Sequence, residues 1–241
     1  MLNESFTFLE NVGGKKEVKI KEQVRDWNGF LNQNKINGLS DTNKIRCNEQ
    51  ILKAKQALIN NDASFFTNFP EPIKLFNFFK DECVYLDIET TGYYGDITVI
   101  GLYDGYETKM MIKGYNLNKE VIKNELQKYK MIVTFNGASF DLPVIKKYFG
   151  ADVIPEVPHL DLRFACAKIG LKGGLKKIEK KLGISRSNEV NSMSGADAVN
   201  LWNQFQTTGN KKYLKLLIKY NQEDIINLKT IANIVYDKLK R

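Results

Sequence analysis

The sequence predicts an α/β fold in which helices flank a mixed sheet, preceded by a small and mainly helical N-terminal region. Three observations predict this class: apolar runs of strand length, an alternation of helix and strand in the middle of the chain, and a final third with only helical periodicity. The apolar runs lie at residues 82–89, 97–103 and 107–113. Because their connections are short, and Asp104-Gly105 is a turn signal, we expect three antiparallel neighbours.

An alternation of helix and strand follows these runs. Residues 118–128 and 140–149 have helical periodicity, and an apolar strand at 131–135 lies between them. Pro143 falls in the first turn of the second helix, where a missing N–H is tolerated. A strand that returns through a helix pairs in parallel, so the sheet is mixed and ligands are expected at the carboxyl ends of its strands.

After residues 159–162 the chain is predicted to be helical throughout. A Thr-Thr-Gly-Asn break at 207–210 separates the last two helices, and apolar residues at helical spacing, from Ile225 to Leu239, predict that the final helix packs on the core. The expected helices are 163–169, 175–182, 196–206 and 211–239.

Length and composition predict two units, residues 1–80 and residues 81–241. The 43% of hydrophobic residues suffices for a full core. No apolar run reaches the roughly 18 residues of a membrane span, and the charged-then-apolar order of a secretory signal is missing, so we expect a cytoplasmic protein with no membrane partner. Cys47, Cys83 and Cys166 are too few and too far apart for a disulfide framework or a zinc site, and we expect them to be reduced and buried.

The formal net charge of +8 fits a polyanionic partner such as nucleic acid. Residues 1–80 carry 12 basic and 9 acidic side chains, so both units are basic. A Gly-Gly turn at 10–16 faintly resembles the hairpin of a helix-hairpin-helix motif, although Asn11 stands where its first glycine is usual. We interpret this segment as an ordinary turn and assign no DNA binding to it.

Two carboxylates end the first predicted strand. Asp87 and Glu89 are two residues apart, so both project from one face of the strand. Asp141, at the start of a helix, and Asp224, on the last helix, add two more acids. Four converging carboxylates suit two Mg²⁺ or Mn²⁺ ions about 3.5 to 4 Å apart, which clamp the oxygens of a phosphoryl transfer. We predict that Asp87 bridges the ions, that Glu89 and Asp224 complete one coordination sphere, and that Asp141 acts on the other ion through water.

These segments resemble the motifs of the DEDD superfamily of 3′ to 5′ exonucleases, which has a ribonuclease H-like (DnaQ-like) fold. The family motifs take the form DxE, NxxxFD and a tyrosine or histidine before a final aspartate, and the chain has them in order at 87–89, 136–141 and 220–224. The resemblance covers about residues 81–241. Within the superfamily, segments 159–163 and 175–182 are similar to the predicted exonucleases of the YprB-like type.

The third motif indicates the tyrosine subclass, termed DEDDy. Tyr220 lies four residues before Asp224, while Lys219 occupies the position of the histidine in the other subclass. Residues four apart share a helix face, so the two side chains can lie side by side. The resemblance implies that the Tyr220 hydroxyl orients the attacking water, since a phenol with an ordinary pKa near 10 is a poor general base.

The resemblance also implies contacts to the substrate. The turn at Thr90, Thr91 and Gly92 is expected to touch the 3′-terminal nucleotide, although threonine and glycine also simply terminate strands well. Asn136 either fixes the loop before Asp141 or only ends a strand, and Phe140 is interpreted as a core residue.

Charged and aromatic residues offer further contacts. The basic run that contains Lys172, Lys176 and Lys177 is assigned to phosphates, the alternative being a solvated helix face. Tyr93 and Tyr94 are candidates for stacking on bases. His159 and Asp161 are left out of the catalytic set, because a lone histidine is more often a structural hydrogen bonder.

The predicted function is a metal-dependent 3′ to 5′ exonuclease that releases nucleoside 5′-monophosphates from single-stranded DNA, a chemistry suited to DNA repair. An exoribonuclease that trims RNA is the first alternative, because only contacts to the 2′-hydroxyl distinguish the two sugars. A non-catalytic module that binds nucleic-acid ends is the second, and a proofreading subunit is a third. A homo-oligomer is compatible with the sequence.

Overall fold

The computed structural model describes residues 2–92 and 95–240. Its centre is a five-stranded mixed sheet in the order β3-β2-β1-β4-β5, which confirms the predicted fold class. The strands β1 to β4 fall where the apolar runs predicted them, whereas β5 was not predicted as a strand. The strands are β1 (Cys83–Thr90), β2 (Ile97–Tyr103), β3 (Thr108–Ile112), β4 (Met131–Thr134) and β5 (His159–Asp161).

The strand β1 lies in the middle of the sheet. It pairs antiparallel with β2, where Asp87 lies opposite Gly101, and in parallel with β4, where Tyr85 lies opposite Val133. The register shifts between Glu89 and Thr90, where the strand ends. The two acids of the first motif therefore lie at the carboxyl end of the central strand.

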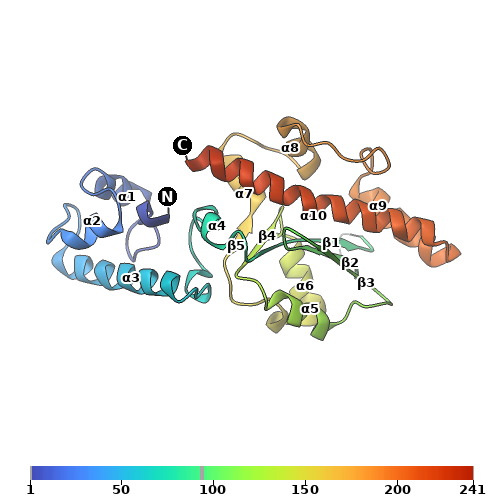
Figure 1. Cartoon of the computed structure of the whole chain (residues 1–241), viewed down its shortest axis with the longest axis horizontal. Helices are drawn as coiled ribbons and strands as arrows, with labels where there is room; N and C mark the ends of the chain where they lie inside the picture. Colours follow the sequence, from blue (N-terminus) through green and yellow to red (C-terminus); the bar gives the residue numbers. More distant parts are fainter. Residues whose placement is uncertain (1, 93–94, 241) are drawn as a thin grey trace.

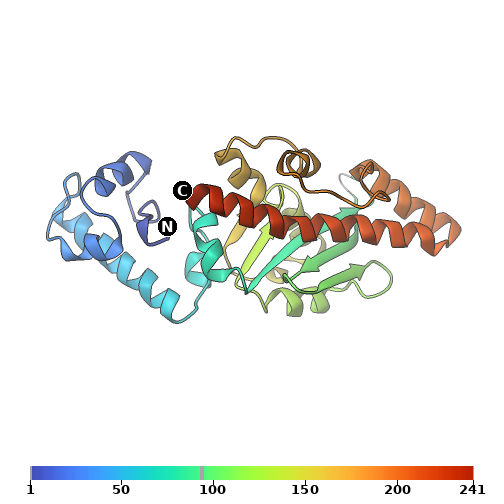
Figure 2. The same ribbon diagram turned by 45° about the horizontal axis from the view of Figure 1, so that its top comes forward.

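Helices cover both faces of this sheet, as Figure 1 shows. On one face, α5 (Lys119–Leu126) and α6 (Asp141–Phe149) pack on Leu86 and Ile88. On the other, the 30-residue helix α10 (Lys211–Lys240) crosses the strands and is joined at its start to α9 (Gly195–Thr208), which Figure 2 makes visible.

Two shorter helices complete the α10 side of the molecule. They are α7 (Leu162–Lys168) and α8 (Leu175–Leu182). Side chains alternate along β1, so Leu86 and Ile88 face α5 and α6 while Asp87 and Glu89 face α10. The acids of the first and third motifs thus share one face of the sheet.

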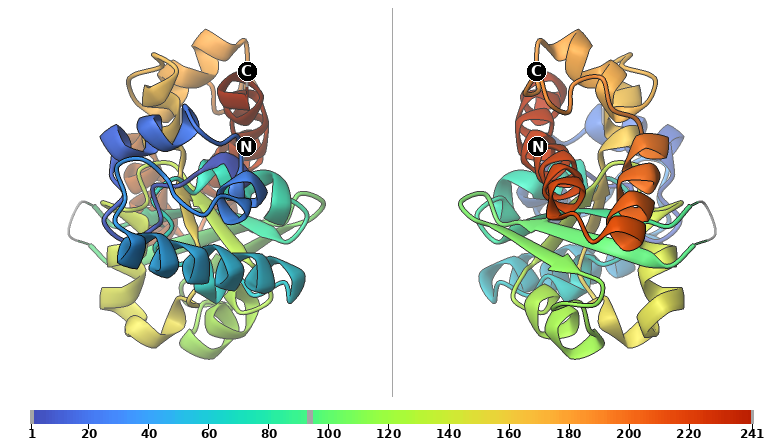
Figure 3. Two further views of the ribbon diagram at one scale, coloured as in Figure 1. Left: turned by 90° about the vertical axis from the view of Figure 1, so that its left-hand side faces the viewer. Right: turned by 90° about the vertical axis from the view of Figure 1, so that its right-hand side faces the viewer.

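The first eighty residues are mainly helical, as predicted. Figure 3 shows this part at one end of the sheet. Its apolar core joins that of the sheet, because Phe76 on α4 packs against Tyr236 on α10, with ring centroids 6.0 Å apart. The division at residue 80 therefore stays a prediction. The helices are α1 (Gly14–Lys21), α2 (Trp27–Asn32), α3 (Asp41–Ile59) and α4 (Ile73–Phe79), and 3-10 turns lie at η1 (Leu2–Glu4), η2 (Ser64–Phe66) and, later in the chain, η3 (Ala151–Val153).

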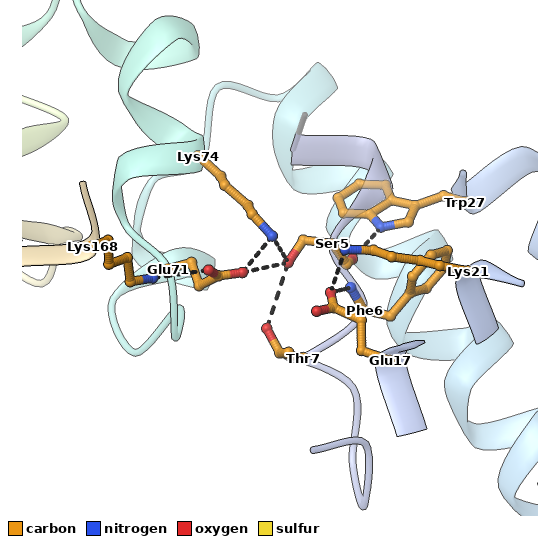
Figure 4. A network of polar contacts seen from close by, with 9 residues as sticks. All are labelled: Ser5, Phe6, Thr7, Glu17, Lys21, Trp27, Glu71, Lys74 and Lys168. Carbon is orange, nitrogen blue, oxygen red and sulfur yellow. Dashed lines mark hydrogen bonds and ion pairs between the residues drawn. The ribbon is translucent and has the colours of Figure 1, made fainter. Parts of the chain in front are cut away.

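A polar network joins the N-terminus to this junction (Figure 4). The hydroxyl of Ser5 accepts a hydrogen bond from Lys74 at 3.1 Å, and its carbonyl accepts one from the Trp27 indole at 2.8 Å. Glu71 forms ion pairs with Lys74 and with Lys168 of α7. Burial raises the pKa of Glu71, but the two lysines outweigh burial and lower that pKa to about 2. The carboxylate therefore stays charged and ties the helical region to the sheet.

Three further expectations concern the cysteines, membrane-spanning helices and the Gly-Gly segment. Cys47, Cys83 and Cys166 are buried and free, as predicted. Within the described part of the chain, no helix combines the length and apolarity that crossing a bilayer requires. In the Gly-Gly segment, Gly13 is the N-cap of α1 and Gly14 its first residue, so the segment starts a helix.

Candidate active site

Three carboxylates meet where β1 ends beneath α10. One oxygen of each of Asp87, Glu89 and Asp224 lies within 4.8 Å of the others. The first two come from one face of β1, and the third comes from the buried side of α10. Hard carboxylate oxygens at this spacing are the donor set that Mg²⁺ and Mn²⁺ prefer. The residues present therefore fit such an ion.

The fourth acid, Asp141, approaches the end of β1 from α6. Asp141 is the first residue of α6 and is 3% exposed. Its Oδ1 accepts a hydrogen bond from the backbone N–H of Ile88, between the two β1 acids, at 3.1 Å. Asp141 thus lies beside the three-acid group without being part of it, an arrangement compatible with a ligand that acts through water.

Without a metal ion, the negative charges of these acids repel one another. Burial and the neighbouring carboxylates raise the pKa of Asp87 and of Glu89 well above their usual values. Burial raises the pKa of Asp141 to about 7 and that of Asp224 to about 6. A divalent cation would reverse this effect by favouring the charged forms.

A buried amide orients Asp87. Asn221, one residue after Tyr220 on α10, is fully buried and donates from Nδ2 to Asp87 Oδ2 at 2.7 Å. Space for this amide comes from Gly101 on β2, because a Cβ there would lie 2.0 Å from Asn221 Oδ1. The sequence analysis missed both residues, although a glycine inside an apolar strand is a signal of close approach.

Arg186 is a third residue that the sequence analysis missed. Its Nε and Nη2 donate to the two oxygens of Glu179, both at 2.7 Å, and Nη2 also donates to Asp224 Oδ1. Asn227 donates to the same Glu179 at 2.9 Å. Only 2% of the arginine side chain is exposed. One oxygen of Asp224 is therefore held by the protein, and the other is left for an ion.

Tyr220 lies in the same cleft and stays neutral. Burial and the nearby Asp224 and Glu89 raise the pKa of its phenol above the usual value. The Nζ of Lys176 lies 4.7 Å from the centre of its ring and has no hydrogen-bond partner within the described residues. Burial lowers the pKa of this ammonium. A neutral Tyr220 can donate a hydrogen bond to a water, so it can orient a nucleophile but not deprotonate it.

The second motif is held by Asp161. Its carboxylate accepts the backbone N–H of Asn136 at 2.8 Å and that of Ala138 at 3.1 Å. Asn136 adopts a left-handed φ of 69°, and its side-chain oxygen accepts from Arg163. Nearby, burial lowers the pKa of His159 to about 4, and its Nε2 pairs with the Thr134 hydroxyl at 2.8 Å. His159 and Asp161 thus shape the loop that carries Asp141.

The predicted substrate contacts lie in different surroundings. Thr90 and Gly92 line the cleft, whereas the Thr91 hydroxyl accepts the backbone N–H of Asp96 at 3.0 Å. Of the basic run, Lys172 and Lys177 are exposed. Lys176 instead turns inward to Tyr220, so the run does not form one surface. The stacking candidates Tyr93 and Tyr94 lie outside the described residues.

The cleft has a volume of about 410 Å³. Its walls come from the end of β1, from Phe140 ahead of α6, from the first turn of α9 and from α10. Phe140 is half-buried and packs on the α6 side of the sheet, so it is part of the core, as predicted, and also faces the cleft. Asp87, Glu89 and Asp224 line the cleft, together with apolar side chains and two glycines.

Comparison with solved structures gives two similar chains. The chain is similar to the family B DNA polymerase from the hyperthermophilic archaeon Pyrobaculum calidifontis, with a TM-score of 0.50 and 13% identity over 64% of this chain. The similarity covers 24% of the polymerase chain, so this chain spans about a quarter of that length. A structure described as the apo form of a nuclease gives a TM-score of 0.48 and 17% identity, covering 66% of this chain and 73% of the nuclease. At 13% identity the likeness to the polymerase shows the fold alone.

Sequence comparison adds a family. No curated protein matches the chain. A family model described as RNase_H superfamily matches residues 84–236, which is more than half of the chain and includes all four acids of the cleft. The chain therefore belongs to the RNase_H superfamily.

Proposed function

We propose that the protein is a metal-dependent 3′ to 5′ exonuclease of the DEDDy type, which releases nucleoside 5′-monophosphates from single-stranded DNA. The observation that carries the proposal is the group of Asp87, Glu89 and Asp224, with ligand atoms within 4.8 Å of one another and Asp141 beside them. Membership of the RNase_H superfamily supports nuclease activity. The YprB-like assignment remains part of this proposal.

The acids would hold two Mg²⁺ or Mn²⁺ ions in the roles that the motifs predict. Such ions supply an activated water and neutralise charge on the phosphodiester. Asn221 and Arg186 fix one oxygen of Asp87 and of Asp224, so the ligands are oriented before any ion binds. Tyr220, held neutral by burial, aligns the water.

The position of Lys176 supports a contact to phosphate. Its ammonium lacks a hydrogen-bond partner among the described residues and lies over the Tyr220 ring. A partly buried ammonium with no hydrogen-bond partner is costly unless an acceptor completes its surroundings. The phosphate of the terminal nucleotide is the anion that the reaction brings to this place.

The cleft favours a frayed, single-stranded end. Glu89 and Asp224 are buried at its floor and Asp87 is half-buried, so a terminal nucleotide must leave its stack to reach them. Because the chemistry acts on the phosphodiester, an RNA end remains the alternative substrate. Cleft geometry argues against the non-catalytic alternative, since Asp87, Glu89, Asp224 and Tyr220 all line the cleft and Asp141 lies beside them.

The test is a gel assay with 5′-labelled single-stranded DNA and RNA of matched sequence, in Mg²⁺, Mn²⁺ or EDTA. The wild type is compared with Asp87→Ala, with Tyr220→Phe and with Asp81→Ala, a matched control in which an exposed acid outside the cleft is removed. We expect a metal-dependent ladder that shortens from the 3′ end. Asp87→Ala should abolish it, and Asp81→Ala should leave it unchanged.

Two results would contradict the proposal. Internal cuts without a ladder would assign an endonuclease to the same site. Tight binding of the labelled ends without cleavage in any metal would leave an end-binding module. The relative rates of cleavage of DNA and RNA show which of the two nucleic acids the enzyme prefers.

A further inference from the structure

A second hollow adjoins the cleft along α6. Its volume is about 490 Å³, and Phe140, Pro143, Lys147 and Tyr148 form its α6 side. Phe140 lines both this hollow and the cleft. A strand that leaves the acid floor over Phe140 therefore enters the second space directly. We refer to it as the α6 hollow.

The walls of the α6 hollow suit the flat faces of bases. Tyr148 is 39% exposed, and its ring is braced edge-on by Phe149 with centroids 4.7 Å apart. Pro143 and Val144 add apolar surface on the neighbouring turn of the helix. Bases stack on such side chains without regard to their identity, because each base has an aromatic face.

The charges around the hollow suit a phosphodiester backbone. Its one acid among the lining residues, Asp96, is paired with Lys113 at 2.6 Å. Lys147 is exposed and has no ion pair or hydrogen bond within the described residues. The hollow therefore carries a net positive charge beside aromatic surface, which is the combination that binds single strands.

We propose that the α6 hollow binds the nucleotides immediately upstream of the bond that is cleaved, with a base stacked on Tyr148 and a phosphate near Lys147. This inference rests on the proposed function and names its substrate more closely. From Phe140 to Tyr148 the helix rises about 12 Å, which matches about three stacked nucleotides at roughly 3.4 Å each.

The consequence is a requirement for unpaired nucleotides beyond the terminal one. A paired base cannot stack on Tyr148, because its own helix covers its face. The preferred substrate is thus a single strand or an end with an unpaired overhang, without base specificity. A substrate that stops at the terminal nucleotide should not use the hollow at all.

The test compares a substrate that ends at the terminal nucleotide with one that extends into the α6 hollow. The 4-nitrophenyl ester of thymidine 5′-monophosphate occupies the cleft alone: water adds to phosphorus, the P–O bond breaks and nitrophenolate leaves. A short single-stranded DNA also fills the α6 hollow. Hydrolysis of both is measured in Mn²⁺, and binding of the labelled DNA is measured by fluorescence anisotropy in EDTA, where no cleavage occurs.

Three variants are matched for this comparison. Tyr148→Ala removes the stacking ring, and Tyr148→Phe keeps it. Tyr106→Ala removes another exposed tyrosine, which lies 80% exposed on the β2–β3 turn at the opposite end of β1. We expect Tyr148→Ala to raise KM and Kd for the oligonucleotide about tenfold. The other two variants should keep wild-type values, and all three should hydrolyse the ester normally.

Charge is tested separately with Lys147→Gln. Loss of one phosphate contact should lower the slope of log Kd against log salt by about 0.7 for a single strand. An unchanged slope would remove the phosphate contact from the proposal.

The remaining outcomes of these experiments also test the proposal. Equal loss of ester and oligonucleotide hydrolysis in Tyr148→Ala would overturn the proposal, because the effect would then lie in the fold or the cleft. An unchanged Kd would overturn it as well. If the wild type hydrolyses neither substrate, the proposed exonuclease function fails, while the anisotropy series still decides whether the hollow binds a single strand.

Discussion

Replacement of Arg186 by methionine should destabilise the protein strongly. The guanidinium donates twice to Glu179 and once to Asp224, and the three side chains are 2%, 3% and 8% exposed. Methionine fills similar space but leaves two buried carboxylates unpaired. Removal of one partner from a buried ion pair costs about 3–5 kcal/mol. For a chain of this size we expect the melting temperature to fall by about 6–20 °C.

The assay is urea unfolding followed by circular dichroism, without metal. Arg46→Met is the matched control: Arg46 and Glu10 lie 3.6 Å apart with side chains 56% and 51% exposed, so its loss should cost less than about 1 kcal/mol. Replacing Arg186 and Glu179 together by methionine should cost less than Arg186→Met alone, because one unpaired charge is then also removed.

The same change should weaken metal binding. Arg186 fixes one oxygen of Asp224, and loss of such a partner of a ligand typically lowers metal affinity about 10- to 100-fold. Titration calorimetry with Mn²⁺ measures this directly. A free energy of unfolding and an Mn²⁺ affinity equal to those of Arg46→Met would refute the reasoning, since neither the burial nor the orientation of Asp224 would then depend on Arg186.

Three further predictions concern the cleft. Burial raises the pKa of Asp224 to about 6 and that of Asp141 to about 7, so the folded state binds protons more tightly than the unfolded state. Metal-free stability should therefore fall as the pH rises from about 4 to about 7. Mg²⁺ should restore stability increasingly toward pH 8, measured as melting temperature with and without the ion. Tyr220→Phe should lower kcat roughly 100-fold with little change in Mn²⁺ affinity, measured by steady-state kinetics and calorimetry. Gly101→Ala should cost about 1–3 kcal/mol in urea unfolding and weaken Mn²⁺ binding, because the new Cβ would meet Asn221 at 2.0 Å.

Each of these has a result that would contradict it. Metal-free stability that rises between pH 5 and 7 would mean that these carboxylates are not buried together. A rate for Tyr220→Phe within about twofold of the wild type would remove the hydroxyl from water alignment. For the glycine, Gly14→Ala is the control, because a Cβ at this first residue of α1 meets nothing within 4 Å. Equal stability of the two variants would exclude the crowding at Asn221.

Local patterns were sufficient to predict the first four strands of the sheet and the elements that carry the acids. Residues two apart on β1 share a face, which placed Asp87 and Glu89 together, and residues four apart on α10 placed Tyr220 beside Asp224. The helix that starts at Asp141 followed from periodicity and a tolerated proline. The ranges of the strands and of the last helices agree closely with the structure, because each is a long apolar pattern with a clear break.

The residues that orient the acids have no such pattern. Arg186 lies in a polar loop, and its partners Glu179 and Asp224 lie on two different helices. A single acid among the lysines of α8 was the only local sign of this network. Lys176 has the sequence of a surface lysine, yet tertiary packing turns it onto Tyr220.

By itself, then, the sequence determined most of the elements, which face of each is apolar and which elements carry the four acids, because periods of two and of 3.6 residues depend on neighbours along the chain. Only the tertiary structure decided how those acids are held. The contacts of Asn221 with Gly101, of Arg186 with Asp224 and of Asp161 with the Asn136 loop join residues distant in the chain. Their energies depend on burial and on distances of a few ångströms, which arise only when β1, β5, α8 and α10 pack together.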